Sequence, residues 1–155
     1  MIKIETDFTS FRHGIINVIG KVKIASEQGM EKAVKQFMDD ALHVPPTVPR
    51  ETGGMAASHS AFVNNNLVAT SASEPTTGEA APTPLLVAPP TGKELVGTLI
   101  VHRRQAASLH EGISRHGTPY KFKSPGSGKK WIEAKVIRFG QKYFGMIAGR
   151  IRRAK

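Results

Sequence analysis

The sequence predicts an α+β fold, in which a long N-terminal helix and a C-terminal helix pack on a small antiparallel sheet. Apolar residues recur in steps of three and four near both ends of the chain, which is typical of amphipathic helices. Two segments rich in β-forming residues, 58–71 and 93–104, lie between them on either side of the Pro-rich stretch 72–92. A chain of 155 residues buries roughly 70% of its unfolded surface, so we expect a single domain over residues 1–155.

The N-terminal region predicts a short strand followed by the long helix. Ile2 and Ile4 alternate with polar residues over Met1–Glu5, as in a strand. A helix over Ser10–His43 follows, and at about 1.5 Å per residue it would be roughly 50 Å long. Its apolar stripe consists of Phe11, Ile15, Val18, Val22, Ala25, Ala33, Phe37 and Ala41.

Glycines inside this helix weaken it, because each costs about 1 kcal/mol relative to alanine. We therefore predict a kink or a break near Gly20 or Gly29. Gly29 also lies on the apolar stripe, where the missing side chain would let another element pack closely. The acidic pair Asp39 and Asp40 is interpreted most simply as a solvated face of the helix.

A sharp turn is predicted where the helix ends. Pro45 and Pro46 lack the amide hydrogen that a helix needs, so the helix should end before them. Pro49, Thr52 and Gly53 then form a structural turn that reverses the chain and leads into the first β-forming segment.

The β-forming segments predict antiparallel pairing around a long loop. Asn64–Asn66 interrupts the first segment and indicates a bulge, a tight turn or a polar exposed edge. Residues 72–92 have no helical period and should form a flexible or extended surface loop. Alternatively, their apolar patch Pro84–Pro89 makes them an arm that docks on a neighbouring subunit. Lys93–Arg104 should then return as a strand beside Ser58–Ser71.

The C-terminal third predicts a short helical turn, a loop and a final helix. The turn spans Ala106–Glu111 and is stopped by Gly112, and the loop spans Ile113–Ser127. The final helix runs over Ser127–Arg152 (127–152) with Ser127 as its N-cap. Its apolar stripe consists of Ile132, Val136, Phe139, Tyr143 and Ile147.

The charge is concentrated near the C-terminus. Residues 1–102 carry 8 Lys and Arg against 10 Asp and Glu, whereas residues 103–155 carry 14 against 2. Such a basic block can meet nucleic acid, an acidic protein or a membrane surface. No apolar run reaches the roughly 18 residues of a membrane span, and no signal peptide is evident, so we expect no membrane partner. The candidate oligomer- or DNA-facing residues are Lys135, Arg138, Lys142, Arg150 and Arg153.

The motifs that would indicate catalysis are incomplete. The chain has no cysteine, which excludes a disulfide framework and a thiolate metal site. His110 and Glu111 suggest the zinc motif HExxH, but the next histidine, His116, lies six positions on rather than four, so we expect a local hydrogen bond. Gly126–Lys130 lacks the upstream glycine and the Ser or Thr of a P-loop. We therefore predict that the chain is not an enzyme and holds no cofactor or metal.

Three segments, taken in order, resemble a family of phage structural proteins. The first, Val48–Ser58, reads Val-Pro-x-x-Thr-Gly-x-Met-x-x-Ser, and the second, Ala106–Gly112, reads Ala-x-x-Leu-His-Glu-Gly. The third is Trp131-Ile132-Glu133 at the start of the last helix. Over Phe8–Arg152 this order is similar to the minor capsid and tail-completion proteins of tailed phages, also called head–tail joining or neck proteins. Gln105 stands where members of that family often have an aromatic residue.

The resemblance implies a structural virion protein rather than a catalyst. Such proteins assemble as rings, commonly hexameric, which join head and tail around the DNA channel. By this resemblance we expect a neck or tail-completion (tail terminator) subunit that contacts itself and neighbouring neck, connector or tail-tube proteins, and lies in the virion after assembly in the host cytoplasm. DNA would pass through the ring. The alternative from the residues alone is a small basic nucleic-acid-binding protein that uses the C-terminal helix.

Overall fold

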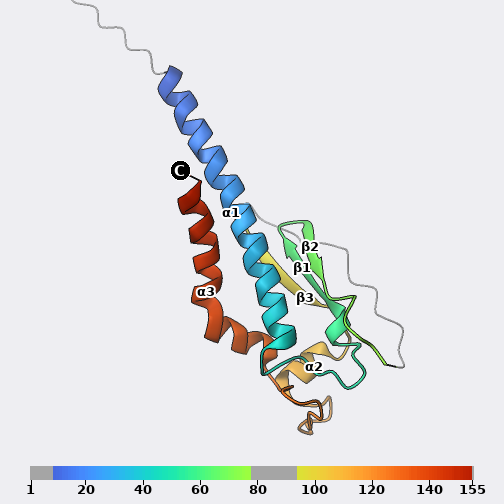
Figure 1. Ribbon diagram of the computed structural model, residues 1–155. Coiled ribbons are helices and arrows are strands. Elements are labelled where there is room, and N and C mark those ends of the chain that lie inside the picture. Colours follow the sequence, from blue (N-terminus) through green and yellow to red (C-terminus); the bar gives the residue numbers. More distant parts are fainter. Residues whose placement is uncertain (1–8, 78–93, 155) are drawn as a thin grey trace, which may run out of the picture.

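The computed structural model describes residues 9–77 and 94–154 and confirms the α+β fold (Figure 1). The predicted strand at Met1–Glu5 and most of the Pro-rich segment lie outside the described residues. The elements in chain order are α1 (Thr9–His43), the 3₁₀ turn η1 (Ala56–Ser58), β1 (His59–Val63), β2 (Asn66–Thr70), β3 (Gly97–Val101), α2 (Ala106–Glu111) and α3 (Trp131–Arg153).

The long helix α1 is continuous over Thr9–His43, so of the kink or break predicted near Gly20 or Gly29, the break is wrong. Gly20 is exposed, with nothing within 4 Å of the position that a Cβ would take. The helix continues through it despite the low helix propensity of glycine. Gly29 allows another element to pack closely, as its place on the apolar stripe predicts. A Cβ there would lie 2.7 Å from the Cα of Ile147, so the backbones of α1 and α3 approach closely at this point. Packing on α3 therefore supports the helix where its propensity is weak.

The sheet has the order β2-β1-β3, and β1 pairs antiparallel with both neighbours. The Asn triplet forms a tight hairpin turn, since Val63 pairs with Asn66 across it and Asn64 has a left-handed φ of 51°. The Asn64 side chain accepts a hydrogen bond from the Val96 amide at 3.0 Å, which ties the turn to the start of β3. The second β-forming segment therefore returns beside the first, as predicted, although β3 is shorter than 93–104.

The core lies on both sides of the C-terminal half of α1, which separates the sheet from α3 (Figure 1). Val34, Met38 and Leu42 of α1 are buried there with Ala61 of β1. Trp131, the first residue of α3, is fully buried at the base of the same cluster. Its ring meets His110 of α2 edge-on, with 4.9 Å between centroids, and so joins α2 to the core.

The final helix begins later than the sequence predicts. Ser127 is not its N-cap, because the Ser127 hydroxyl donates to the Ser124 carbonyl at 2.6 Å. The chain continues as a turn to Lys130, which has a left-handed φ of 59°, and the helix starts at Trp131. The short helix α2 has the predicted bounds, and Gly112 ends it with a φ of 74°.

Candidate interaction surfaces

The predicted structural turn ties the end of α1 to the loop after β2. Gly53 has a φ of 75°, and a side chain at this position would collide with the Pro75 carbonyl. The carbonyl of Thr52 accepts a hydrogen bond from the Thr77 amide at 2.9 Å. Beside them, the Arg50 guanidinium contacts Glu74 at 2.6 Å and donates to the Leu42 carbonyl at 2.9 Å. These contacts fix the turn against the end of α1 and the loop after β2.

Of the basic residues that the sequence places in one row, Lys135 does not reach the surface. It is 1% exposed, and its Nζ donates to the Pro46 carbonyl at 2.7 Å. Burial lowers the pKa of its ammonium group. Lys135 therefore holds the start of α3 against the end of α1, and its interpretation as an oligomer- or DNA-facing residue is wrong.

Lys142 lies at the edge of a buried polar cluster between α1 and α3. Its centre is Asp40, which is 4% exposed, so the interpretation of this residue as part of a solvated face is wrong. Asp40 accepts hydrogen bonds from the Tyr143 hydroxyl at 2.8 Å and from Gln36 Nε2 at 3.0 Å, and Lys142 Nζ lies 3.4 Å away. Burial and the Asp40 carboxylate raise the pKa of Tyr143. The Tyr143 ring also packs on Phe37, with 5.5 Å between centroids.

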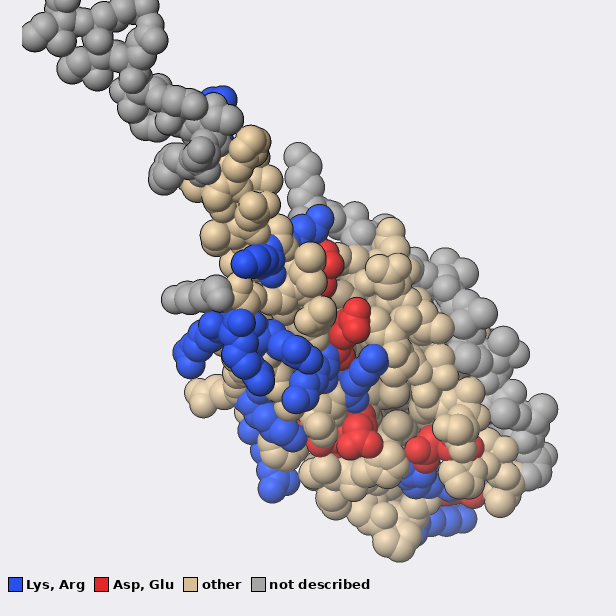
Figure 2. Space-filling view, turned by 45° about the horizontal axis from the view of Figure 1, so that its top comes forward, with Lys and Arg blue, Asp and Glu red and all other residues tan. Residues whose placement is uncertain are grey.

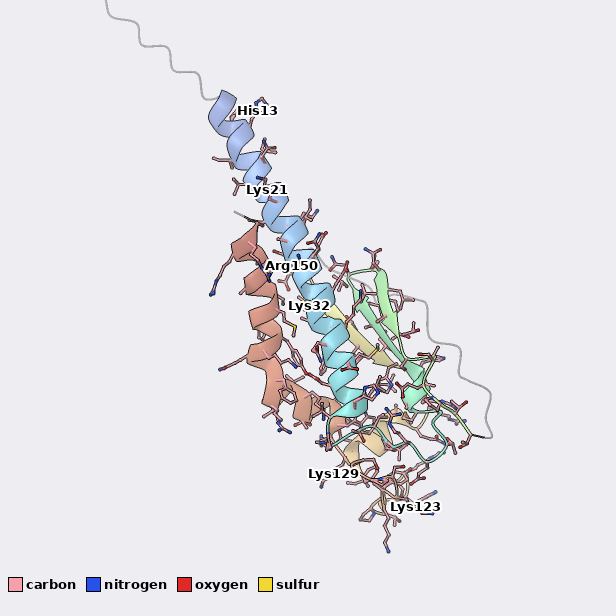
Figure 3. All side chains as sticks on the ribbon, viewed as in Figure 1. His13, Lys21, Lys32, Lys123, Lys129 and Arg150 are labelled. Carbon is pink, nitrogen blue, oxygen red and sulfur yellow. The ribbon has the colours of Figure 1, made fainter. Side chains whose placement is uncertain are left out.

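The remaining candidates, Arg138, Arg150 and Arg153, are exposed. Basic side chains of α1 and α3 gather on the face of the molecule that Figure 2 shows. Arg138 lies over the Phe139 ring at 5.0 Å, and Arg153 Nε donates to the Gly149 carbonyl at 3.0 Å. Arg150 and Lys32 point to the same side of the two helices (Figure 3). They line a groove of about 500 Å³, and the residues that complete its lining are Gln28, Glu31, Lys35, Gln36 and Asp39. The basic face is thus interrupted by acidic side chains.

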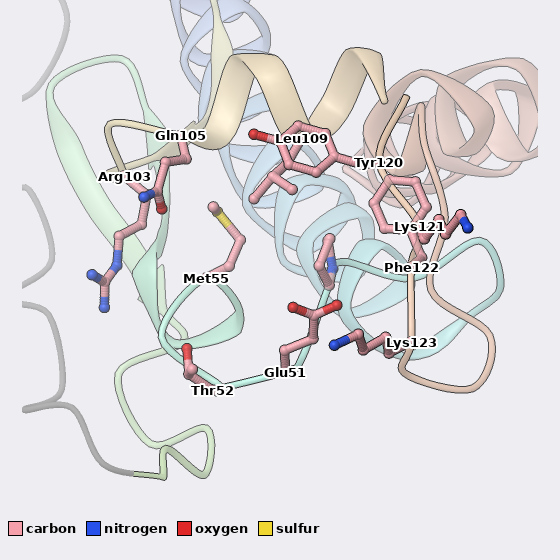
Figure 4. Close-up of a pocket in the computed structure, with 11 residues that line it drawn as sticks. Glu51, Thr52, Met55, Arg103, Gln105, Leu109, Tyr120, Lys121, Phe122 and Lys123 are labelled. Atoms are coloured by element: carbon pink, nitrogen blue, oxygen red, sulfur yellow. The ribbon is translucent and has the colours of Figure 1, made fainter. Parts of the chain in front are cut away.

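A second hollow lies where the structural turn faces α2 (Figure 4). Its volume is about 360 Å³, and its charged lining residues include Glu51, Arg103 and Lys123. Glu51 and Lys123 point toward each other, while the Arg103 guanidinium points away from them (Figure 4) and its Nε donates to the Gly54 carbonyl at 3.2 Å. No histidine lines this hollow, and its charged groups do not converge on one point.

His110 and Glu111 interact locally, as the sequence predicts. His110 Nδ1 lies 3.4 Å from Glu111 Oε1, and Lys130 Nζ lies 2.7 Å from the other carboxylate oxygen of Glu111. The hydrogen bond from Lys130, and to a smaller extent that from His110, lowers the pKa of Glu111. Within residues 9–77 and 94–154, no three His, Asp or Glu side chains gather closely enough to hold a metal ion.

The N-terminal half of α1 presents an apolar surface that the sequence does not identify as a site. In Figure 1, α1 projects well past the C-terminal end of α3. Five of its large aliphatic side chains there are 43–63% exposed, namely Ile15, Ile16, Val18, Ile19 and Ile24. The sequence shows the apolar stripe of this helix. It does not show the point along α1 beyond which α3 no longer covers that stripe.

An uncharged groove forms a second apolar surface, between α1, α3 and the start of β3. Its volume is about 250 Å³, and no charged residue lines it. Two of its lining residues on α3 are exposed, Val136 at 54% and Phe144 at 73%. In its middle, Gly140 has nothing within 4 Å of the position that a Cβ would take, so there is open space above the helix.

In the part of the chain that the structure describes, no helix is long and apolar enough to cross a lipid bilayer. Comparison with known proteins found no matching family model, no matching curated protein and no matching solved structure.

Proposed function

We propose that this chain is a structural subunit of a tailed-phage particle, a neck or tail-completion (tail terminator) protein that forms a ring joining head and tail around the DNA channel. The order of the Thr-Gly turn, the Leu-His-Glu-Gly segment and the Trp-Ile-Glu helix start supports the family. The structural observation that carries a role in assembly is the projecting half of α1, which exposes five large aliphatic side chains.

Such a surface favours association over an independent monomer. Ile15, Val18 and Ile19 form one exposed apolar stripe of this helix. A monomeric protein rarely leaves a contiguous apolar surface uncovered, and burying one Ile or Val side chain contributes about 1.5–3 kcal/mol. A subunit of a closed assembly has a partner for this surface, because each copy repeats the same contact with the next copy. A catalyst would instead need convergent polar groups in a pocket, and the hollow beside Thr52 does not offer them.

The basic face fits the same role in two ways. In a ring around DNA, Arg138, Arg150 and Arg153 would lower the electrostatic cost of the passing phosphates. Against another neck, connector or tail-tube protein, they would select an acidic surface. The proposal therefore places the protein in the virion, after assembly in the host cytoplasm.

Two measurements test this function together. Mass spectrometry of phage particles, purified from the bacterium that carries the sequence, should detect the chain at a stoichiometry of several copies per particle. Electron microscopy of the isolated protein or of disrupted particles should show a ring. If the chain is missing from purified particles while it is abundant in the lysate, the proposal is wrong.

A second candidate function is duplex binding by a monomer or dimer through the basic face. The observation that favours it is the gathering of exposed Arg and Lys over α1 and α3 (Figure 2). Binding should then weaken steeply with salt, and Arg138→Glu with Arg150→Glu should remove it. Lys142→Glu is a poor probe, because it would place a carboxylate beside Asp40. The matched control is Arg115→Glu, an exposed charge in the loop before α3.

A further inference from the structure

We infer that the projecting half of α1 in one copy docks into the apolar groove between α1 and α3 of a second copy. The inference rests on the proposed function, since it names the contact by which the subunits of the assembly would join. The occupant is thus a second copy of this chain, and the contact pairs two different surfaces.

The projecting helix carries the spacing that a groove recognises. Ile15, Val18, Ile19 and Val22 follow the pattern i, i+3, i+4, i+7, which places them in one stripe along the helix. Ile15, Val18 and Ile19 are exposed and Val22 is half-buried. This stripe leads into Ala25 and Gly29, which are buried. The same helical face is therefore covered by α3 in its later part and uncovered in its earlier part.

The groove offers a surface of matching chemistry. Met30 and Val34 of α1 form one wall, and Val136, Phe144 and Ile147 of α3 form the other. The open space above Gly140 leaves room for a side chain that enters from outside. A docked aliphatic stripe would also cover the Phe144 ring, which is 73% exposed in the isolated chain.

Charge favours this groove over the other surfaces of the molecule. The projecting half of α1 carries Arg12, Lys21 and Lys23, and residues 12–26 contain no Asp or Glu. A contact between two such helices, or with the basic face, would bring like charges together. Arg138 and Lys142 are each two positions from Gly140, so they lie on the opposite side of α3 from the groove.

The geometry of the contact predicts an asymmetric assembly. The helix and the groove are different patches, so the contact is heterologous and each copy can use both at once. Repetition of the contact closes a ring or extends a filament, according to the rotation between copies. A symmetric pairing of one α1 with another would stop at a dimer.

The test uses the full chain, with one variant for each surface and a matched control for each variant. Ile19→Asp places a charge on the stripe, and Asn17→Asp places the same charge on the opposite side of the helix. Gly140→Leu fills the groove, and Gly145→Leu adds the same side chain where space is equally open but outside the groove. Circular dichroism and thermal melting verify that all four variants fold.

Sedimentation velocity then measures self-association. Ile19→Asp and Gly140→Leu should each weaken it by at least about tenfold, while both controls should associate like the wild type. An equimolar mixture of Ile19→Asp with Gly140→Leu should form a 1:1 dimer and nothing larger. In that mixture, the intact helix of one variant meets the intact groove of the other.

The outcomes separate this contact from the proposed function. A wild-type chain that remains monomeric up to its solubility limit overturns the contact, and so does unaltered association of Gly140→Leu or a mixture that forms no dimer. Detection of the chain in particles would leave the proposed function standing in each of these cases. Conversely, the 1:1 dimer could form from a chain that purified particles lack, which would overturn the function alone.

Discussion

At the scale of single residues, two adjacent carboxylates have opposite roles. Asp39 is exposed and contacts the exposed His43 ring, with 3.0 Å between Asp39 Oδ1 and His43 Nδ1. Asp40, one helical step on, is buried and accepts hydrogen bonds from Tyr143 and Gln36. Because α3 packs on this side of α1, the polar cluster around Asp40 fixes how the two helices face each other.

Asp40→Ala should therefore lower the free energy of unfolding by about 1–3 kcal/mol, because it leaves the half-buried Tyr143 hydroxyl without its acceptor. Asp39→Ala is the matched control and should change stability by no more than about 0.5 kcal/mol. Urea unfolding of both variants measures the difference. Equal effects of the two substitutions would contradict the buried role of Asp40.

His59 makes stability depend on pH. The ring is fully buried, its Nδ1 donates to the Ala56 carbonyl at 3.2 Å, and its Nε2 has no hydrogen-bond partner among the described residues. Burial lowers the pKa of His59 to about 4, from 6.5. The folded protein thus keeps the ring neutral, while the unfolded chain binds a proton below about pH 6.5.

Since the unfolded state binds more protons between these two pKa values, this contribution to stability is complete above about pH 6.5 and is lost as the pH falls toward 4. Between about pH 7.5 and pH 5 the expected loss is about 2 kcal/mol. The measurement is urea unfolding across this range for the wild type and His59→Asn. The variant should lack that part of the slope; an unchanged slope would show that another group causes it.

At the scale of elements, the close approach of α1 and α3 at Ile147 requires the missing side chain of Gly29. A Cβ on Gly29 would lie 2.7 Å from the Cα and 3.3 Å from the carbonyl oxygen of Ile147. Both are backbone atoms, so a new side chain cannot be accommodated by a rotamer change. The helices themselves would have to separate.

Gly29→Ala should consequently destabilise the protein by about 1–2 kcal/mol, because overpacking costs more than the roughly 1 kcal/mol that alanine adds to helix propensity. Gly20→Ala, where nothing lies within 4 Å, should be neutral or stabilising by up to about 1 kcal/mol. Thermal unfolding of the pair checks the sign. Stabilisation by both substitutions would show that the helices do not touch at Gly29.

The same elements show what periodicity can and cannot predict. The stripes of α1 and α3, the antiparallel return of β3 and the stop of α2 at Gly112 follow from local spacing and turn chemistry. The burial of Lys135 does not, because its partner is the Pro46 carbonyl, far away in the sequence. Nor does the start of α3, which depends on Trp131 entering the core rather than on a cap at Ser127.

At the scale of the whole molecule, the candidate surfaces arise from the way α1, α3 and the sheet are positioned against each other. The basic row is predicted from α3 alone, yet the groove beside Arg150 is built with Lys32 and Lys35 of α1. The apolar groove needs α1, α3 and Gly97 of β3 together. The projecting surface exists because α1 is longer than the helix that packs on it. No pattern within one segment carries such information.

Hydrogen exchange should reveal the two halves of α1 as different environments. In the Gly140→Leu variant, amides over about residues 12–24 should exchange fast, because an uncovered helix of this length is marginal in water. Amides over 25–43 should stay protected by the core. In the assembled wild-type protein both parts should be protected. Equal, slow exchange of both halves in a verified monomer would show that the projecting half needs no partner.

The close approach at Gly29 also sets the direction in which the projecting part of α1 points. The part of α1 before Gly29 is roughly 30 Å long, so a tilt of about 5° of the helix at Gly29 moves its N-terminal end by about 2–3 Å. A substitution at Gly29 would then move Ile15, Val18 and Ile19 out of line with the apolar groove that we propose as their binding site, although these residues stay unchanged. In the proposed assembly, small errors in this direction would accumulate from copy to copy as altered curvature, even where each subunit stayed folded.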